Sequence, residues 1–371
     1  MKKPMKWLKR TAAFAVTLGA VLFAMPASVS AATEFNINNG AVTITADGDY
    51  TITGDGTATA NTITVESGVS ANITLAGVNI DVSSQNNKAA FKIADNSAGN
   101  VTITLADGTT NTLKSGRFCA GLQKNGEYSE DLGTLTIQGT GSLTATGGEY
   151  NAAGIGSGSG GNCSNITIEG GIITANGGEY NGAGIGGGQN GNCSNITIKG
   201  GEITANGGNY GAGIGGGYKG SGSGITINGG TVTANGGDSG AGIGGGLSGD
   251  GSNITIEGGT VTANGGDSGA GIGGGSDGGD GSNITIEDGT VTANGGKNGA
   301  GIGGGWCGDG SGINISNSLV KVTAGANASS IGGGRGGNGA ADLSNTQNAI
   351  IVDNTARTVT VYGNVTLNRG F

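Results

Sequence analysis

The sequence predicts an all-β fold, a right-handed parallel β-helix with three short strands in each coil of about 29–30 residues. The main observation is a repeated unit that reads Ile-Thr-Ile, then Val-Thr-Ala, then Ala-Gly-Ile-Gly. Within the first two runs apolar and polar residues alternate, which is the period of a β-strand. Glycine pairs separate the runs, and glycine is the residue that turns with positive φ favour.

The nearly constant length of the repeat is typical of a solenoid. The first isoleucine of the unit recurs every 29 or 30 residues, at Ile166, Ile196, Ile225, Ile254, Ile284 and Ile313. Stacked coils place equivalent residues about 4.8 Å apart, so side chains one period apart are expected to form columns. One inner column is predicted for Ile168, Ile198, Ile227, Ile256, Ile286 and Ile315. Right-handed winding is expected from the general handedness of crossovers between parallel strands.

Four regions are expected along the chain. Residues 1–31 have a basic start, an apolar run and small residues before Ala31, which predicts a signal peptide and a secreted or cell-surface protein. Residues 32–132 are expected to form an N-terminal cap and divergent coils, and residues 133–345 the regular coils. Residues 346–371 are expected to hold terminal strands of an incomplete coil. No further apolar run predicts a membrane span.

Composition excludes several classes of function. Without residues 1–31 the chain keeps 12 basic and 26 acidic residues, a net charge of −14, which argues against nucleic acid as a partner. The sequence has no histidine, so it lacks the Ser–His and Cys–His pairs of many hydrolases. The uniform repeats also show no inward-converging carboxylates of the kind a glycosidase needs. We therefore expect a non-catalytic protein, with a polysaccharide lyase or hydrolase as the less favoured alternative.

Aromatic residues recur at the turns of successive coils. Tyr150, Tyr180 and Tyr210 share one turn position, which predicts an aromatic strip about 10 Å long. Tyr218 and Trp306 share a second turn column. Aromatic faces suit the apolar C–H faces of sugars, so these five residues are candidate carbohydrate contacts. Alternatively, the rings stabilise glycine-rich turns by burying area.

A polar column immediately precedes the first tyrosine column. Its acidic members are Glu149, Glu179, Asp238 and Asp267. Carboxylates one coil apart repel each other unless a cation or a raised pKa relieves them, and oxygen-rich turns suit calcium. These four residues are therefore candidate calcium ligands. A solvated acidic edge is the alternative.

Two cysteines are spaced for a disulfide between neighbouring coils. Cys163 and Cys193 are 30 residues apart at equivalent positions, which predicts Cα atoms near 5 Å apart, within disulfide range. An exported protein keeps such a bond. Cys119 and Cys307 lie several coils apart and are not expected to pair with each other.

Two runs carry a family resemblance. Residues 102–113 (TITLADGTTNTL) and 135–143 (LTIQGTGSL) resemble a clostridial carbohydrate-binding β-helix family, and the Gly-Ala-Gly-Ile-Gly-Gly-Gly coils look like repeats of bacterial surface proteins. The resemblance implies a right-handed parallel β-helix, bound calcium and affinity for plant-type or acidic polysaccharide. At residues 120–126 the chain departs from the family pattern, and only Asp107 is carried over, as a candidate metal ligand.

These observations predict a secreted or cell-surface carbohydrate-binding protein of the adhesin type, stabilised by calcium. Its expected partner is a plant-type or acidic polysaccharide, or a component of the cell wall. The alternative is a purely structural spacer or stalk.

Overall fold

The computed structural model describes residues 31–126, 132–339, 343 and 346–363. The chain divides into residues 1–31 and 32–371, and all the strands lie in the second unit. The predicted signal peptide, apart from Ala31, lies outside the described residues, as does the strand-like run at residues 365–367. None of the described helices is long and apolar enough to cross a membrane.

Three β-sheets of eleven strands each form the fold. Sheet A contains β1 (Thr33–Asn36), β3 (Gly48–Thr53), β5 (Ala71–Ala76), β8 (Val101–Leu105), β11 (Leu135–Gly139), β14 (Cys163–Ile168), β17 (Cys193–Ile198), β20 (Gly222–Ile227), β23 (Gly251–Ile256), β26 (Gly281–Ile286) and β29 (Gly310–Ile315). Sheet B contains β2 (Val42–Ile44), β4 (Ile63–Val65), β7 (Phe91–Ile93), β10 (Leu122–Lys124), β13 (Ile155–Gly156), β16 (Ile185–Gly186), β19 (Ile214–Gly215), β22 (Ile243–Gly244), β25 (Ile272–Gly273), β28 (Ile302–Gly303) and β31 (Ile331–Gly332). Sheet C contains β6 (Asn79–Asp81), β9 (Thr110–Lys114), β12 (Ser142–Thr146), β15 (Ile172–Asn176), β18 (Glu202–Asn206), β21 (Thr231–Asn235), β24 (Thr260–Asn264), β27 (Gly289–Asn294), β30 (Ser318–Thr323), β32 (Ala349–Asp353) and β33 (Thr358–Tyr362).

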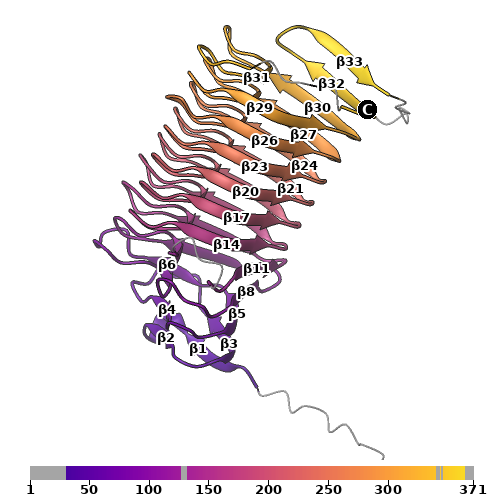
Figure 1. Ribbon diagram of the computed structural model, residues 1–371. Coiled ribbons are helices and arrows are strands. Elements are labelled where there is room, and N and C mark those ends of the chain that lie inside the picture. Colours follow the sequence, from indigo (N-terminus) through magenta and orange to yellow (C-terminus); the bar gives the residue numbers. More distant parts are fainter. Residues whose placement is uncertain (1–30, 127–131, 340–342, 344–345, 364–371) are drawn as a thin grey trace, which may run out of the picture. The chain divides into compact units, whose positions relative to one another are not determined.

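The chain visits the sheets in the order A, C, B, and repeats this order in every complete coil from β5 to β31. Figure 1 shows the strands of successive coils lying side by side. All strand pairs are parallel except the last, β32 with β33. The predicted parallel β-helix with three strands per coil is therefore confirmed, and its right-handed winding stays a prediction.

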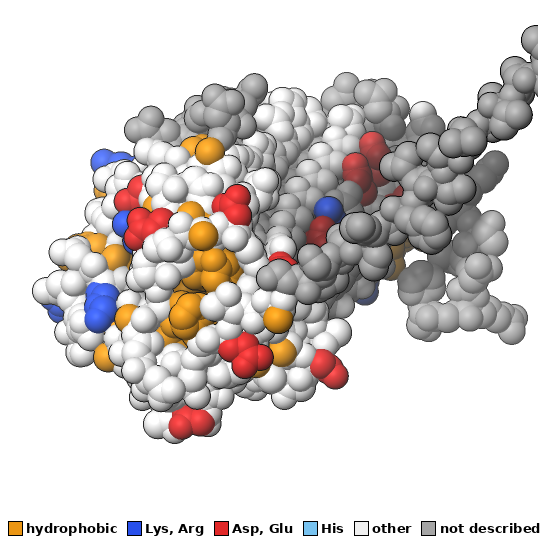
Figure 2. All heavy atoms as spheres, turned by 90° about the horizontal axis from the view of Figure 1, so that it is seen from below, with side chains coloured by type: hydrophobic (Ala, Val, Ile, Leu, Met, Phe, Trp, Pro, Cys, Tyr) orange, Lys and Arg blue, Asp and Glu red, His pale blue; other side chains and the backbone are white. Residues whose placement is uncertain are grey.

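The first coils are simpler than the later ones. Strands β1 to β4 contribute only to sheets A and B, and sheet C is reached there by an isolated bridge between Thr59 and Ile80. A short 3₁₀-helix, η1 (Ile37–Asn39), buries Ile37. In Figure 2, which looks onto this end, hydrophobic side chains gather near the middle with acidic ones around them. Residues 32–87 include six acidic and no basic residues, and such charge disfavours edge-to-edge pairing.

At the other end the chain turns back on itself. Strand β33 runs antiparallel to β32 and forms the edge of sheet C. The predicted strand-like run Val359-Thr360-Val361 lies within β33, where both valines are exposed. The alternation of residues predicts a strand here, but it carries no information about strand direction.

Columns of equivalent side chains hold the coils together. All six isoleucines of the predicted inner column are buried, and burying one such side chain stabilises the fold by about 1.5–3 kcal/mol. Outside the core, Asn176, Asn206, Asn235, Asn264 and Asn294 form an amide ladder with N···O distances of 2.8 Å. The ladder fixes the register at the end of these sheet C strands, where the loops toward sheet B begin.

Candidate functional site

The tyrosines lie on two loops of each coil, one before and one after the short sheet B strand. Tyr150, Tyr180 and Tyr210 occupy the first loop of three successive coils, and Tyr218 occupies the second. The Tyr218 N–H donates to the Asn181 carbonyl at 2.9 Å, which places the second loop of one coil against the first loop of the preceding coil. We call Tyr150, Tyr180, Tyr210 and Tyr218 the tyrosine edge.

The first two rings of the tyrosine edge pack on each other. The centroids of Tyr150 and Tyr180 are 5.5 Å apart and the planes differ by 8°. The Arg117 guanidinium lies over Tyr150, 4.7 Å from the ring centroid, and donates two hydrogen bonds of 3.1 Å to the Glu149 carboxylate. Rings that stack in this way use their faces on each other, so they offer a ligand mainly their edges and hydroxyl groups.

Tyr210 does not continue this stack as the sequence predicted; it turns toward Tyr218. The two centroids are 5.7 Å apart and the planes differ by 58°. The loop after Tyr210 has one residue fewer than the loop after Tyr180, which changes the path of the chain there. Tyr180 and Tyr210 are each 37% exposed, so the centre of the tyrosine edge is open to solvent.

Trp306 lies in the same second-loop column as Tyr218, three coils further on. Backbone bonds join the members of this column: the Lys219 N–H donates to Leu247, Ser248 to Ser276, and Gly278 to Trp306. The Trp306 side chain is 42% exposed. The predicted column is confirmed, and it places a second aromatic group on the same line of loops as Tyr218.

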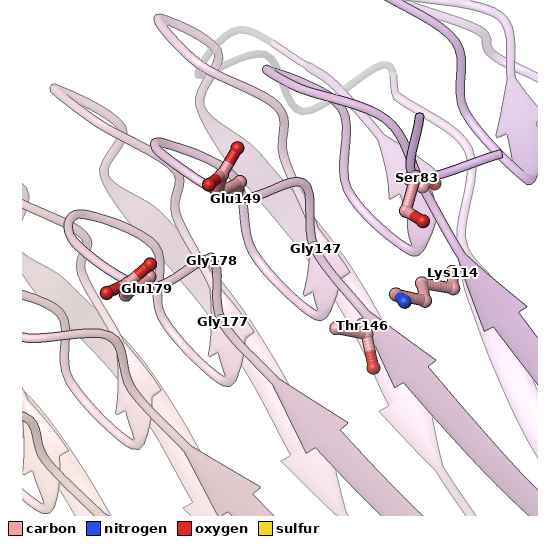
Figure 3. A pocket seen from close by; sticks show the side chains of 9 residues that line it. Ser83, Lys114, Thr146, Gly147, Glu149, Gly177, Gly178 and Glu179 are labelled. Atoms are coloured by element: carbon pink, nitrogen blue, oxygen red, sulfur yellow. The ribbon is translucent and has the colours of Figure 1, made fainter. Parts of the chain in front are cut away.

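A groove of about 470 Å³ opens beside Glu149 and Glu179. Its further lining side chains include Ser83, Lys114 and Thr146. In Figure 3 the two glutamates extend from neighbouring loops, and Lys114 lies among the strands. The groove therefore offers both donors and acceptors of hydrogen bonds next to the tyrosines.

The predicted calcium ligands are spread over separate coils. Glu149 already pairs with Arg117, and Asp107 accepts a hydrogen bond of 2.8 Å from the Thr140 hydroxyl. Asp238 and Asp267 are exposed on successive loops. Among the residues that the structure describes, no three His, Cys, Asp or Glu side chains converge on one point where a metal ion could sit. Calcium binding therefore stays a prediction from the sequence.

The four cysteines lie in different environments. Cys163 and Cys193 form a disulfide with Cα atoms 4.6 Å apart, as their spacing predicted. Both are buried in the core. Cys119 and Cys307 are free, the first buried and the second exposed, and burial raises the pKa of the Cys119 thiol.

Sequence reasoning missed one buried charge, Lys124. It pairs with Ile93 in the sheet B register and is only 3% exposed. Its ammonium donates a hydrogen bond of 2.8 Å to the Ser164 carbonyl, and burial lowers its pKa from 10.5 to about 8. The signal was present in the run Leu122-Gln123-Lys124, where the alternation places a lysine two residues after a core leucine.

Replacing Lys124 by methionine should stabilise the protein by about 3 kcal/mol at pH 7, because the folded chain then carries no buried ammonium. The unfolded chain binds this proton up to pH 10.5 and the folded chain only up to about pH 8. The wild type therefore gains stability from Lys124 as the pH rises through this window, and the advantage of K124M should nearly vanish at pH 10.5. Urea unfolding of both proteins at the two pH values measures this, and an advantage independent of pH would contradict it.

Comparison with known families supports the repeat assignment. A beta helix repeat family model matches residues 135–159, 166–189, 196–218, 225–247, 254–276 and 284–306. These segments correspond to six successive coils, and they include the whole tyrosine edge and Trp306. No curated protein sequence and no solved structure matches the chain.

Proposed function

We propose that this beta-helix repeat protein is a secreted or cell-surface, non-catalytic protein of the adhesin type that binds polysaccharide along its tyrosine edge. The observation that carries the proposal is the concentration of tyrosine rings, of which Tyr180 and Tyr210 are exposed and Tyr150 and Tyr218 half-buried. Four of the seven tyrosines of the chain lie on one line of loops across three coils. Aromatic side chains bury a large area at little cost in conformational entropy, and they dominate the energy of many binding surfaces.

The surroundings of the tyrosine edge suit a sugar ligand. The groove beside Glu149 and Glu179 offers hydrogen-bond partners for hydroxyl groups. Tyr210 and Tyr218 provide tilted rings against which C–H groups can pack, Tyr210 being 37% exposed, and the Lys219 ammonium lies 5.3 Å from the centroid of the Tyr218 ring. A few placed polar groups beside aromatic surface are the usual composition of a specific ligand site.

Binding without catalysis is favoured by the chemistry of the edge. A glycosidase holds two carboxyl groups on opposite sides of the scissile bond. At the edge, Glu149 and Glu179 belong to the same side chain column, and Glu149 is neutralised by Arg117. The chain also has no histidine to act as a base near pH 7.

Further observations support the proposed location outside the cell and the proposed polysaccharide ligand. The N-terminal residues have the pattern of a signal peptide, and the disulfide fits an oxidising compartment. The resemblance of residues 102–113 and 135–143 to clostridial carbohydrate-binding β-helices points in the same direction.

A structural spacer is the second candidate, and one observation favours it. Tyr150 is covered by Arg117 on one face and stacks on Tyr180 through the other. A ring held in this way contributes to the packing of coils even when no ligand is present. If the whole tyrosine edge served packing alone, its removal would lower stability and leave polysaccharide binding, if any, unchanged.

The test is the triple variant Tyr180→Ser, Tyr210→Ser, Tyr218→Ser in affinity electrophoresis through gels that contain plant polysaccharides. Serine already occupies these columns at Ser239, Ser268 and Ser276, so the loops should keep their fold. We expect the wild type to be retarded and the triple variant to lose at least about tenfold in affinity, as aromatic anchors of binding sites do.

The matched control is Ile172→Thr, which removes an exposed apolar side chain from sheet C, away from the edge, and inserts the residue found at Thr231 and Thr260. This control should bind like the wild type. Equal retardation of the wild type and the triple variant would reject the tyrosine edge, and no retardation of the wild type by any polysaccharide would favour the spacer. The same gels with calcium or with a chelator test the calcium prediction.

A further inference from the structure

The second-loop column that includes Tyr218 continues beyond the tyrosine edge. From Tyr218 the second-loop column runs through Leu247 and Ser276 to Trp306, joined at each step by a backbone hydrogen bond. We propose that the ligand is a neutral, linear polysaccharide that lies lengthwise along this column and contacts Trp306 as a second aromatic subsite. This inference rests on the proposed function and specifies the ligand of the same surface.

The distance between the two aromatic subsites fits an extended polysaccharide. Tyr218 and Trp306 are three coils apart, which corresponds to about 14 Å at the spacing of β-strands. One coil step is close to the length of one pyranose unit in an extended chain, so about four sugar units cover the distance. A short oligosaccharide reaches one subsite, whereas a longer one reaches both.

The side chains between the subsites leave room for such a chain. On the first loops of these coils, Ser239 and Ser268 replace the tyrosines, and Ser276 in the second-loop column is buried. Leu247 is half-buried and is the only large side chain between Tyr218 and Trp306 in the column. Apart from Leu247, these loop positions therefore carry small side chains.

Between the two subsites the exposed charges are acidic, whereas at one end the Lys219 ammonium lies 5.3 Å from the centroid of the Tyr218 ring. Asp238 and Asp267 are exposed on the first loops between the subsites, one in each coil. Their neighbours Ser239 and Ser268 accept backbone hydrogen bonds from Ser276 and Trp306, so both carboxylates lie close to the column. A carboxylate accepts hydrogen bonds from sugar hydroxyls and repels a uronate. Glu179 adds a further negative charge beside the tyrosines.

Binding at two linked subsites predicts a steep dependence on ligand length. Once one end is bound, the second contact becomes intramolecular, which raises the overall affinity without changing either subsite. The probes are linear β-1,4-linked gluco-oligosaccharides of two to eight units, titrated by calorimetry into the wild type, Trp306→Ser and the triple tyrosine variant. A polygalacturonate oligosaccharide of matched length serves as the acidic probe.

For the wild type we expect affinity to rise at least about tenfold between the disaccharide and the hexasaccharide, and the acidic probe to bind more weakly. Trp306→Ser should remove most of this rise, because the longer probes then reach only the tyrosine subsite. The loop should keep its fold, since serine already occupies this column at Ser276. Affinity independent of length, a length dependence that survives Trp306→Ser, preference for the acidic probe, or no binding of any glucan probe would each overturn the inference. In all four cases, retardation of the wild type but not of the triple variant by polysaccharide gels would leave the proposed function standing.

Discussion

Replacing Gly215 by alanine should destabilise the protein by more than about 3 kcal/mol, above the usual range for single substitutions. Gly215 ends strand β19 with φ +133°, a region that is nearly restricted to glycine. A Cβ atom built there would lie 2.0 Å from the carbonyl oxygen of Gly244 on the next coil. Because that oxygen belongs to hydrogen-bonded backbone, no side-chain rotation can relieve the contact.

The control for this substitution is Gly278→Ala. Gly278 also has a positive φ, +86°, but nothing lies within 4 Å of the position of its Cβ. We expect this variant to cost only about 1 kcal/mol, the penalty for an L-residue in the left-handed region. Urea unfolding followed by circular dichroism gives the free energy of unfolding of both variants. An equal loss of stability in the two would contradict the close approach of neighbouring coils at Gly215.

Removing the disulfide should lower the free energy of unfolding by about 3–4 kcal/mol, because Cys163 and Cys193 close a loop of 30 residues. The double variant Cys163→Ala, Cys193→Ala isolates this effect, since glycine occupies the same column at Gly222 and Gly251. The loss of a small side chain at these positions is therefore compatible with the coil. Urea unfolding under non-reducing conditions measures the difference.

Cys119→Ala is the control for the disulfide prediction. It removes a buried thiol that has no disulfide partner, and should cost no more than about 1–2 kcal/mol. A double variant that unfolds at the same urea concentration as the wild type would mean that the disulfide adds nothing to the stacked coils. Peptide mapping should recover the Cys163–Cys193 link in the wild type.

Much of the fold was predictable because a solenoid repeats its geometry along the sequence. Equivalent residues lie one period apart, so the isoleucine column, the Cys163–Cys193 pair and the column that joins Tyr218 to Trp306 all followed from spacing alone. Glycine pairs marked the turns for two reasons. Between sheets A and C the second glycine has a positive φ, as at Gly171 and Gly201, whereas after sheet C a glycine such as Gly208 has no positive φ and leaves no room for a Cβ against the preceding coil.

The orientations of individual side chains were not predictable. The repeat period determines which residues are neighbours, but it does not determine the conformations of their side chains. Tyr210 leaves the stack for Tyr218 because its loop is one residue shorter, and Arg117 covers Tyr150 from a coil that lies outside the regular repeat. Lys124 is buried in the same irregular part of the chain, where residue identities do not follow the column pattern. The direction of β33 likewise depends on a turn that follows the last repeat.

The most direct test of the account is hydroxyl-radical footprinting with and without the polysaccharide that retards the protein most in the gels. Mass spectrometry then reports the oxidation of individual aromatic side chains. We predict protection of Tyr180, Tyr210 and Tyr218 by the polysaccharide, with unchanged oxidation of Tyr50, which is partly exposed on strand β3, several coils away from the tyrosine edge. Oxidation of the three tyrosines that is the same with and without the bound polysaccharide would contradict the account.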